Sequence, residues 1–173
     1  MKSTIIFIKN VFFDIYFFEF LWYTGLKEKK GSEIVMKVMA VDFGDARTGV
    51  AVSDLLCSIV GSTTVIHSRN TEKTLQELQR LIAENGVTEI AVGLPKNMDG
   101  TEGARAELCR NFAQRLEEAT GLPVQLWDER RTTVEAHNIL SAHNYHGKKR
   151  KNTVDAVAAA LILEGYLAYR SRK

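Results

Sequence analysis

The chain has 173 residues, of which 45% are hydrophobic and 25% are charged, and its formal net charge at pH 7 is only +2. This length predicts one domain with a sizeable core. The small net charge does not by itself require a nucleic-acid partner, so any basic surface must be local. The two cysteines, Cys57 and Cys109, lie far apart and outside any metal-ligand spacing. They argue against a disulfide framework or a zinc site and favour a reducing, cytoplasmic location.

The first 35 residues differ in composition from the rest of the chain. They contain six of the eight phenylalanines, and their apolar stretch is interrupted by Lys9, Asp14 and Glu19. Charges inside a membrane span are costly, and a secretory signal needs an uninterrupted apolar core. We therefore predict that residues 1–35 are an extension outside the fold, as a translation start upstream of the true one would produce. A membrane-associating segment is the alternative. Residues 36–173 are expected to form the folded domain.

From Met36 onward, short apolar or β-branched runs bounded by turn residues predict five strands. The first three are separated by short turns and are expected to pair antiparallel. The last two alternate with helices and are expected to lie parallel to the first. The predicted fold class is therefore α/β, with a mixed five-stranded sheet flanked by helices. The strands are expected over Val38–Asp42, Gly49–Ser53, Thr63–His67, Ile90–Val92 and Val124–Trp127.

Helical spacing of apolar residues predicts the helices that connect these strands. The first is expected to end at Asn85-Gly86 and the second at Gly121. A capping box over Thr132–Glu135 predicts a third helix. A last helix is expected to begin at Asn152 or Thr153, with an inner face of Val154, Val157, Ala158, Leu161 and Ile162.

Three acids fall at corresponding places in this scheme. Asp42 ends the first strand, Glu129 follows the fifth, and Asp155 lies in the first turn of the last helix. Parallel strands end at the same edge of a sheet, where open α/β sheets bind their ligands. The alanines after Asp155 let its helix approach the sheet closely. Converging carboxylates suit magnesium or manganese, and two such ions can activate a water for phosphodiester cleavage.

Each acid also has a purely structural interpretation. Asp42 can cap its own turn, Glu129 can pair with a neighbouring arginine, and Asp155 can favour the positive end of its helix. Asp128 is an alternative ligand in place of Glu129. The coincidence of three such acids, rather than any one of them, favours a metal site.

Basic residues flank the predicted site. Phosphate backbones are bound by such clusters, whereas a solvated loop is the alternative for the last group of cations. The candidates for substrate binding are Arg47 in the first turn, Arg130 after the fifth strand, and Lys148, Lys149 and Lys151 before the last helix.

Four motifs occur in order: DFGDARTGVAVSD, VGLPKNMDGTEG, LWDERRTTVEA and KNTVDAVAAALIL. Together they resemble the YqgF-type family of ribonuclease H-like proteins, from about Met36 to about Tyr169. This family is described as Holliday junction resolvases and as nucleases that mature the 5′ end of pre-16S ribosomal RNA.

The resemblance implies a ribonuclease H-like fold with an acidic triad that binds a divalent metal, magnesium or manganese. Asp42 matches the first-strand aspartate, Glu129 the glutamate of the DER motif, and Asp155 the last-helix aspartate. Lys151 matches a lysine often found four residues before that aspartate. Asn97 belongs to a loop that in the family lies near the active edge and contacts substrate.

The resemblance implies an enzyme, a hydrolase acting on phosphodiester bonds, most simply at the 5′ end of pre-16S rRNA during ribosome biogenesis. Its partners would be RNA or structured DNA, and a pre-ribosomal particle, with the protein a monomer or a homodimer. Cleavage of four-way DNA junctions is the first alternative, and a non-catalytic RNA-binding assembly factor is another. A sugar kinase or ATPase, suggested by Asp42-x-Gly44, would need two such domains, and the chain from Met36 supplies one.

Overall fold

The computed structural model describes residues 36–128 and 148–172, with the side chains of the last helix described from Val154 onward. The described residues belong to one compact unit. The predicted extension over residues 1–35, the capping box at Thr132–Glu135 and the candidates Glu129 and Arg130 lie outside the described residues. The elements in chain order are β1 (Lys37–Phe43), β2 (Arg47–Ser53), β3 (Val60–His67), α2 (Thr71–Asn85), β4 (Val87–Leu94), α3 (Ala104–Thr120), β5 (Val124–Asp128) and α5 (Lys148–Arg170).

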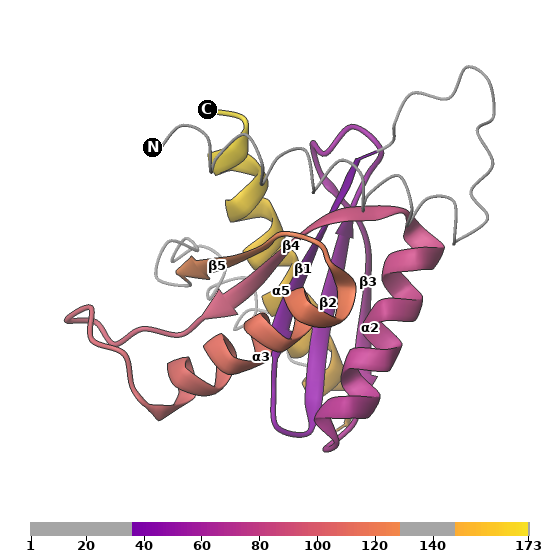
Figure 1. The fold of residues 1–173 in the computed structure, drawn as a ribbon. Helices are drawn as coiled ribbons and strands as arrows, with labels where there is room; N and C mark the ends of the chain where they lie inside the picture. Colours follow the sequence, from indigo (N-terminus) through magenta and orange to yellow (C-terminus); the bar gives the residue numbers. More distant parts are fainter. Residues whose placement is uncertain (1–35, 129–147, 173) are drawn as a thin grey trace, which may run out of the picture. The chain divides into compact units, whose positions relative to one another are not determined.

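The strands form one five-stranded sheet in the order β3-β2-β1-β4-β5. β1 pairs antiparallel with β2, and β2 antiparallel with β3, whereas β4 pairs parallel with both β1 and β5. In Figure 1, α2 and α3 lie on one side of this sheet and α5 on the other. The mixed sheet and its strand directions confirm the fold predicted from the sequence.

The face of the sheet under α2 and α3 carries large aliphatic side chains. Side chains alternate along a strand, so Met39 and Val41 of β1 point to this face. They pack with Leu78 of α2 and with Phe112 and Leu116 of α3. Burial of such side chains contributes about 1.5–3 kcal/mol each, which makes this layer the main hydrophobic core.

The face under α5 carries small side chains instead. Val38 and Ala40 of β1, Ala51 of β2 and Ala91 of β4 are fully buried there against α5. Short side chains shorten the distance between a helix axis and a sheet, so α5 lies close to the strands. This close packing decides the geometry of the candidate site.

Two helix ends match their sequence signals. Gly86 and Gly121 follow α2 and α3 with φ of 67° in both cases, and each donates its backbone N–H to a carbonyl in the last turn. The left-handed conformation costs a glycine nothing, which is why these residues end the helices.

The prediction for the last helix was wrong in two respects. α5 begins at Lys148, not at Asn152 or Thr153, so Lys148, Lys149 and Lys151 lie in the helix rather than in a loop, and Asp155 is beyond its first turn. Its buried residues are Ala159, Ile162, Leu163, Tyr166 and Leu167, whereas Val154 is 38% exposed and the predicted Val157, Ala158 and Leu161 are only partly buried.

The error has a physical cause. The segment from Val154 to Leu163 is apolar around most of its circumference, so spacing alone does not determine which side faces the sheet.

In the described part of the chain, no helix combines the length and the hydrophobicity that a membrane span requires.

Candidate active site

Asp42 lies near the end of β1, on the face of the sheet that α5 covers. Its neighbours Val41 and Phe43 point to the opposite core, so strand alternation directs Asp42 toward α5. In the ladder between β1 and β2, the residue opposite Asp42 is Gly49. The carboxylate is therefore placed beside a position that has no side chain.

Gly49 allows α5 to reach the sheet at this point. A Cβ atom on Gly49 would clash with the backbone carbonyl oxygen of Asp155 and would lie 3.3 Å from the Cβ of Ala159. Glycine is thus required by the close approach of the helix backbone, and not by its own dihedral angles. The absent side chain brings Asp155 to the end of β1 where Asp42 lies.

Asp42 and Asp155 interact electrostatically. Burial raises the pKa of Asp42 above its ordinary value, and the negative charge of Asp155 raises it further, whereas the positive charge of Arg105 lowers it. Two carboxylates that share a poorly solvated site favour a cation between them. The two residues are therefore a pair of oxygen donors suited to a hard divalent ion.

Arg47, predicted to bind substrate, contacts one of these acids. Its Nε donates a hydrogen bond to Oδ2 of Asp155, and the two side chains are 32% and 21% exposed. Arg47 opens β2 two residues before Gly49, so the contact joins β2 to α5 at the point of closest approach. The sequence indicated a cation here but not its partner.

Arg105, at the start of α3, is a neighbour of the site that the sequence analysis missed. It donates to the backbone oxygen of Phe43 and to Asp45, and its guanidinium lies 5.7 Å from the centroid of the Phe43 ring. It thereby holds the end of β1 and the turn that follows Asp42. The one sequence signal for this role of Arg105 is its position at the start of the helix that follows the VGLPKNMDGTEG motif.

Asp128, the alternative third ligand, lies on the other face of the sheet. It is aligned with Leu94 in the ladder between β4 and β5, and Leu94 packs against α3. The preceding Trp127 packs against α5 and is aligned with Gly93. Strand alternation therefore directs Asp128 away from Asp42. Among the residues that the structure describes, no group of three or more His, Cys, Asp or Glu side chains could hold a metal.

The loop between β4 and α3 is held by its own polar groups. Asn97 is exposed, and its side-chain amide donates to Oγ1 of Thr101, which itself donates to Asp99. At the end of the loop, the hydrogen bond from Arg110 and the nearby Lys96 lower the pKa of Glu102 to about 2. The loop that the resemblance associates with substrate is thus tied to α3.

A shallow groove lies between β3 and α5, close to Asp155. Its volume is about 480 Å³, and Ala156 of its lining directly follows Asp155. His67, at one end of β3, is aligned with Arg47 in the ladder with β2. The groove is lined by Thr63, Thr64, Val65, His67, Ala156, Val157 and Ala160.

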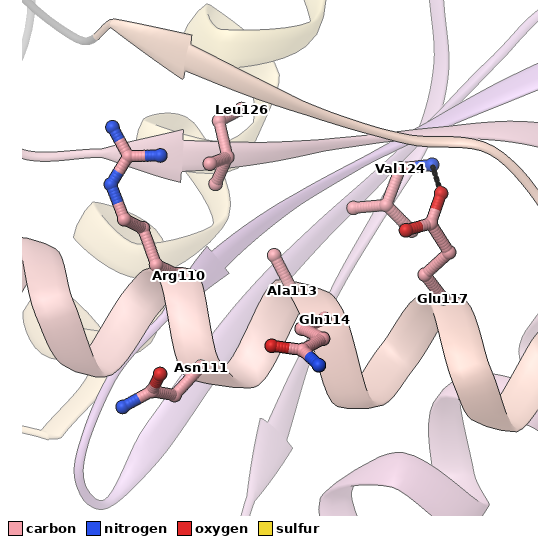
Figure 2. A pocket seen from close by; sticks show the side chains of 7 residues that line it. All are labelled: Arg110, Asn111, Ala113, Gln114, Glu117, Val124 and Leu126. Carbon is pink, nitrogen blue, oxygen red and sulfur yellow. Dashed lines mark hydrogen bonds between the residues drawn. The ribbon is translucent and has the colours of Figure 1, made fainter.

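A second hollow, of about 390 Å³, lies between α3 and β5. Figure 2 shows Asn111 and Gln114 at this hollow, together with Glu117, which accepts a hydrogen bond from the backbone N–H of Val124. The hollow lies on the α3 side of the sheet, whereas Asp42 points to the α5 side. It therefore has no part in the candidate site.

The fold resembles that of a solved structure. The structure of Thermus thermophilus RuvC in complex with a Holliday junction substrate aligns with a TM-score of 0.54 over 79% of this chain and 97% of that one, at 13% identity. At this identity the likeness concerns the fold. Together with the sheet order and the acid at the end of β1, it defines the class as ribonuclease H-like.

The family follows from the sequence comparisons. The model of the RuvX family, described as Holliday junction resolvase, matches residues 36–169, so the chain belongs to the RuvX family. A relative from Carboxydothermus hydrogenoformans, named "Putative pre-16S rRNA nuclease", is 44% identical over 137 residues, which are 79% of this chain and 99% of that protein. One from Halothermothrix orenii has the same name and identity, over 79% of this chain and 98% of its own.

These matches confirm the resemblance drawn from the four motifs. Family and relatives alike are described as enzymes that cut nucleic acid, and the protein is accordingly a nuclease that hydrolyses phosphodiester bonds.

Proposed function

We propose that this nuclease is metal-dependent and processes the 5′ end of pre-16S rRNA in the cytoplasm, during ribosome assembly. The observation that carries the proposal is the proximity of Asp42 and Asp155, whose charges interact where a side chain on Gly49 would clash with the backbone of Asp155. The names of the relatives at 44% identity support the RNA substrate.

The residues at the site fit a divalent ion. Asp42 and Asp155 offer oxygen donors. Burial raises the pKa of Asp42, and repulsion by Asp155 raises it further; a bound cation would favour the ionised carboxylates. Glu129 is the proposed third ligand. It directly follows Asp128, and its assignment rests on the match of the LWDERRTTVEA motif to the family. Bound ions would activate the attacking water and stabilise the leaving oxygen.

The other proposed site residues bind and orient the substrate. Arg47 and Arg130 would bind phosphates near the metal ligands, and Lys148, Lys149 and Lys151 would do so from the first turn of α5. Asn97 would contact the substrate from the loop before α3. The groove between β3 and α5 adjoins Asp155 and is proposed to receive the strand beside the scissile phosphate.

The experiment compares magnesium-dependent cleavage of a pre-16S 5′-leader RNA and of a four-way DNA junction. Wild type is tested beside Asp42→Asn and Asp155→Asn, with Glu84→Gln on the exposed surface of α2 as the control for loss of a carboxylate. We expect cleavage of the RNA by wild type and the control, and a loss of at least about a hundredfold in both aspartate variants.

A second candidate is resolution of Holliday junctions, favoured by the description of the family model. Paired symmetric cuts in the junction, without cleavage of the RNA, would establish it instead. RNA binding without cutting, equal in wild type and variants, would contradict both and indicate an assembly factor.

A further inference from the structure

Arg47 contacts a carboxylate oxygen that would also bind the proposed metal. Its guanidinium Nε donates to Oδ2 of Asp155, one of the two carboxylates assigned to the metal. The pair bridges β2 and α5, which Gly49 brings into contact. The ion pair is therefore part of the candidate site and not a distant surface contact.

The negative charges of Asp42 and Asp155 make a cation favourable at this site. Asp42 is partly buried and is close enough to Asp155 for the two negative charges to repel each other. A buried carboxylate without a compensating charge is costly, and Arg47 supplies that charge to Asp155. A divalent ion that binds the same carboxylate oxygen would compete with the guanidinium for it.

We propose that Arg47 is an exchangeable counter-ion, which holds Asp155 in the metal-free protein and binds a phosphate of the nucleic-acid strand once a divalent ion replaces it. The exchange rests on the proposed function for the identity of the metal and the substrate. Arg47 is thus a substrate-binding residue whose availability depends on the metal.

The surroundings of Arg47 favour a phosphate as its second partner. Arg47 is aligned with His67 in the ladder between β2 and β3, and His67 lines the groove beside Asp155. The guanidinium fork binds phosphate oxygens in pairs, and a polymer lying in the groove presents them close to this position. Metal binding and nucleic-acid binding should therefore strengthen each other by the same factor.

The test measures binding, so that it does not depend on cleavage. Manganese affinity of the full chain is measured by isothermal titration calorimetry. Affinity for a labelled single-stranded RNA is measured by fluorescence anisotropy, with and without calcium, which binds oxygen ligands in a flexible geometry. The variants are Arg47→Gln, Arg47→Lys and, as a matched control, Arg69→Gln, which removes an exposed arginine just beyond β3.

We expect Arg47→Gln to bind manganese about fivefold more tightly than wild type, since it removes a partly exposed ion pair that competes for Asp155. The increase in RNA affinity that calcium produces in wild type should fall by about fivefold in the same variant. Arg47→Lys should restore the manganese affinity of wild type but only part of the RNA affinity, because an ammonium lacks the fork. Arg69→Gln should leave the manganese affinity unchanged.

An unchanged or weaker manganese affinity in Arg47→Gln overturns the exchange, and so does an equal gain in Arg69→Gln, which would indicate a general effect of charge. If wild type cleaves RNA but Arg47→Gln binds manganese no more tightly than wild type, the exchange is refuted while the nuclease proposal stands. The expected binding changes in a protein that cleaves neither RNA nor DNA support the exchange and refute the nuclease proposal.

Discussion

The two faces of the sheet are built from side chains of different size. Under α2 and α3 the strands present Met39, Val41, Val50 and Val92. Under α5, strands β1, β2 and β4 present mainly glycine and alanine, and only β5 presents a large side chain, Trp127, among the described residues. Large side chains fill a thick layer and bury much apolar area, which stabilises the fold. Small side chains bury less but let a helix backbone touch the sheet. The comparison indicates that one face stabilises the domain while the other positions the acids.

The largest expected effect is on the stabilising face. Leu116→Ala in α3 removes a fully buried side chain from the main core and should lower the free energy of unfolding by about 3 kcal/mol, measured by urea denaturation. The cleavage rate per folded molecule should stay at the wild-type value. The control is Leu108→Ala on the same helix, where the side chain is 51% exposed and the cost should be small. Lost cleavage in folded Leu116→Ala would contradict the division between the faces.

Gly49→Ala tests the other face. The added Cβ would clash with the carbonyl of Asp155, so α5 must shift away from β2. A displacement of this size at reacting groups costs about a hundredfold in rate, or about 2.7 kcal/mol in the activation barrier. The control is Gly103→Ala, because no atom lies within 4 Å of a Cβ built there. Wild-type cleavage by folded Gly49→Ala would show that close approach of α5 is unnecessary.

Tyr166→Phe tests how the C-terminal part of α5 is held on the sheet. The Tyr166 hydroxyl donates to Glu89 of β4, and burial together with this bond raises the pKa of Tyr166, so the hydroxyl remains a donor at all physiological pH values. Loss of the bond should lower the free energy of unfolding by about 1.5 kcal/mol. A double-mutant cycle with Glu89→Gln measures the coupling, and a coupling near zero would contradict the anchoring role.

Asp42→Asn should stabilise the metal-free protein by about 1 kcal/mol at pH 7, a rise of about 2–4 °C in Tm. The folded state raises the pKa of Asp42, so ionisation of this carboxylate opposes folding. The penalty is complete above the raised pKa, shrinks as the pH falls through it, and vanishes below the ordinary value of 3.8. The difference between variant and wild type, measured by thermal unfolding in chelator at pH 7 and pH 4, should shrink accordingly. A less stable variant at pH 7 would mean that Asp42 stabilises the fold.

Much of the fold was predictable because its signals are local. Strand directions followed from the lengths of the connections, and Asn85-Gly86 and Gly121 marked helix ends through the left-handed conformation of glycine. The four motifs identified the family correctly. The assignment of Asp42, Glu129 and Asp155 to a metal site stays a prediction, and Glu129 lies outside the residues described.

The start and orientation of α5 were not predictable in this way. A helix that is apolar on most sides can bury any of several sides against the sheet, so its rotation about its own axis is not determined by the sequence pattern. Contact with Gly49 and with the small residues of the sheet selects Ala159 for the innermost position, and this selection determines the direction of Asp155.

By itself, the sequence determined the class of fold, the order of its elements and the residue types suited to binding a metal, since each depends on neighbours along the chain. Only the tertiary structure decided that Arg47 pairs with Asp155, that Arg105 holds the turn after Asp42, and that Asp128 faces away from it. These contacts join residues from different strands and helices. Their geometry depends on how closely α3 and α5 pack on the sheet, and that distance is set by side chains on both elements at once.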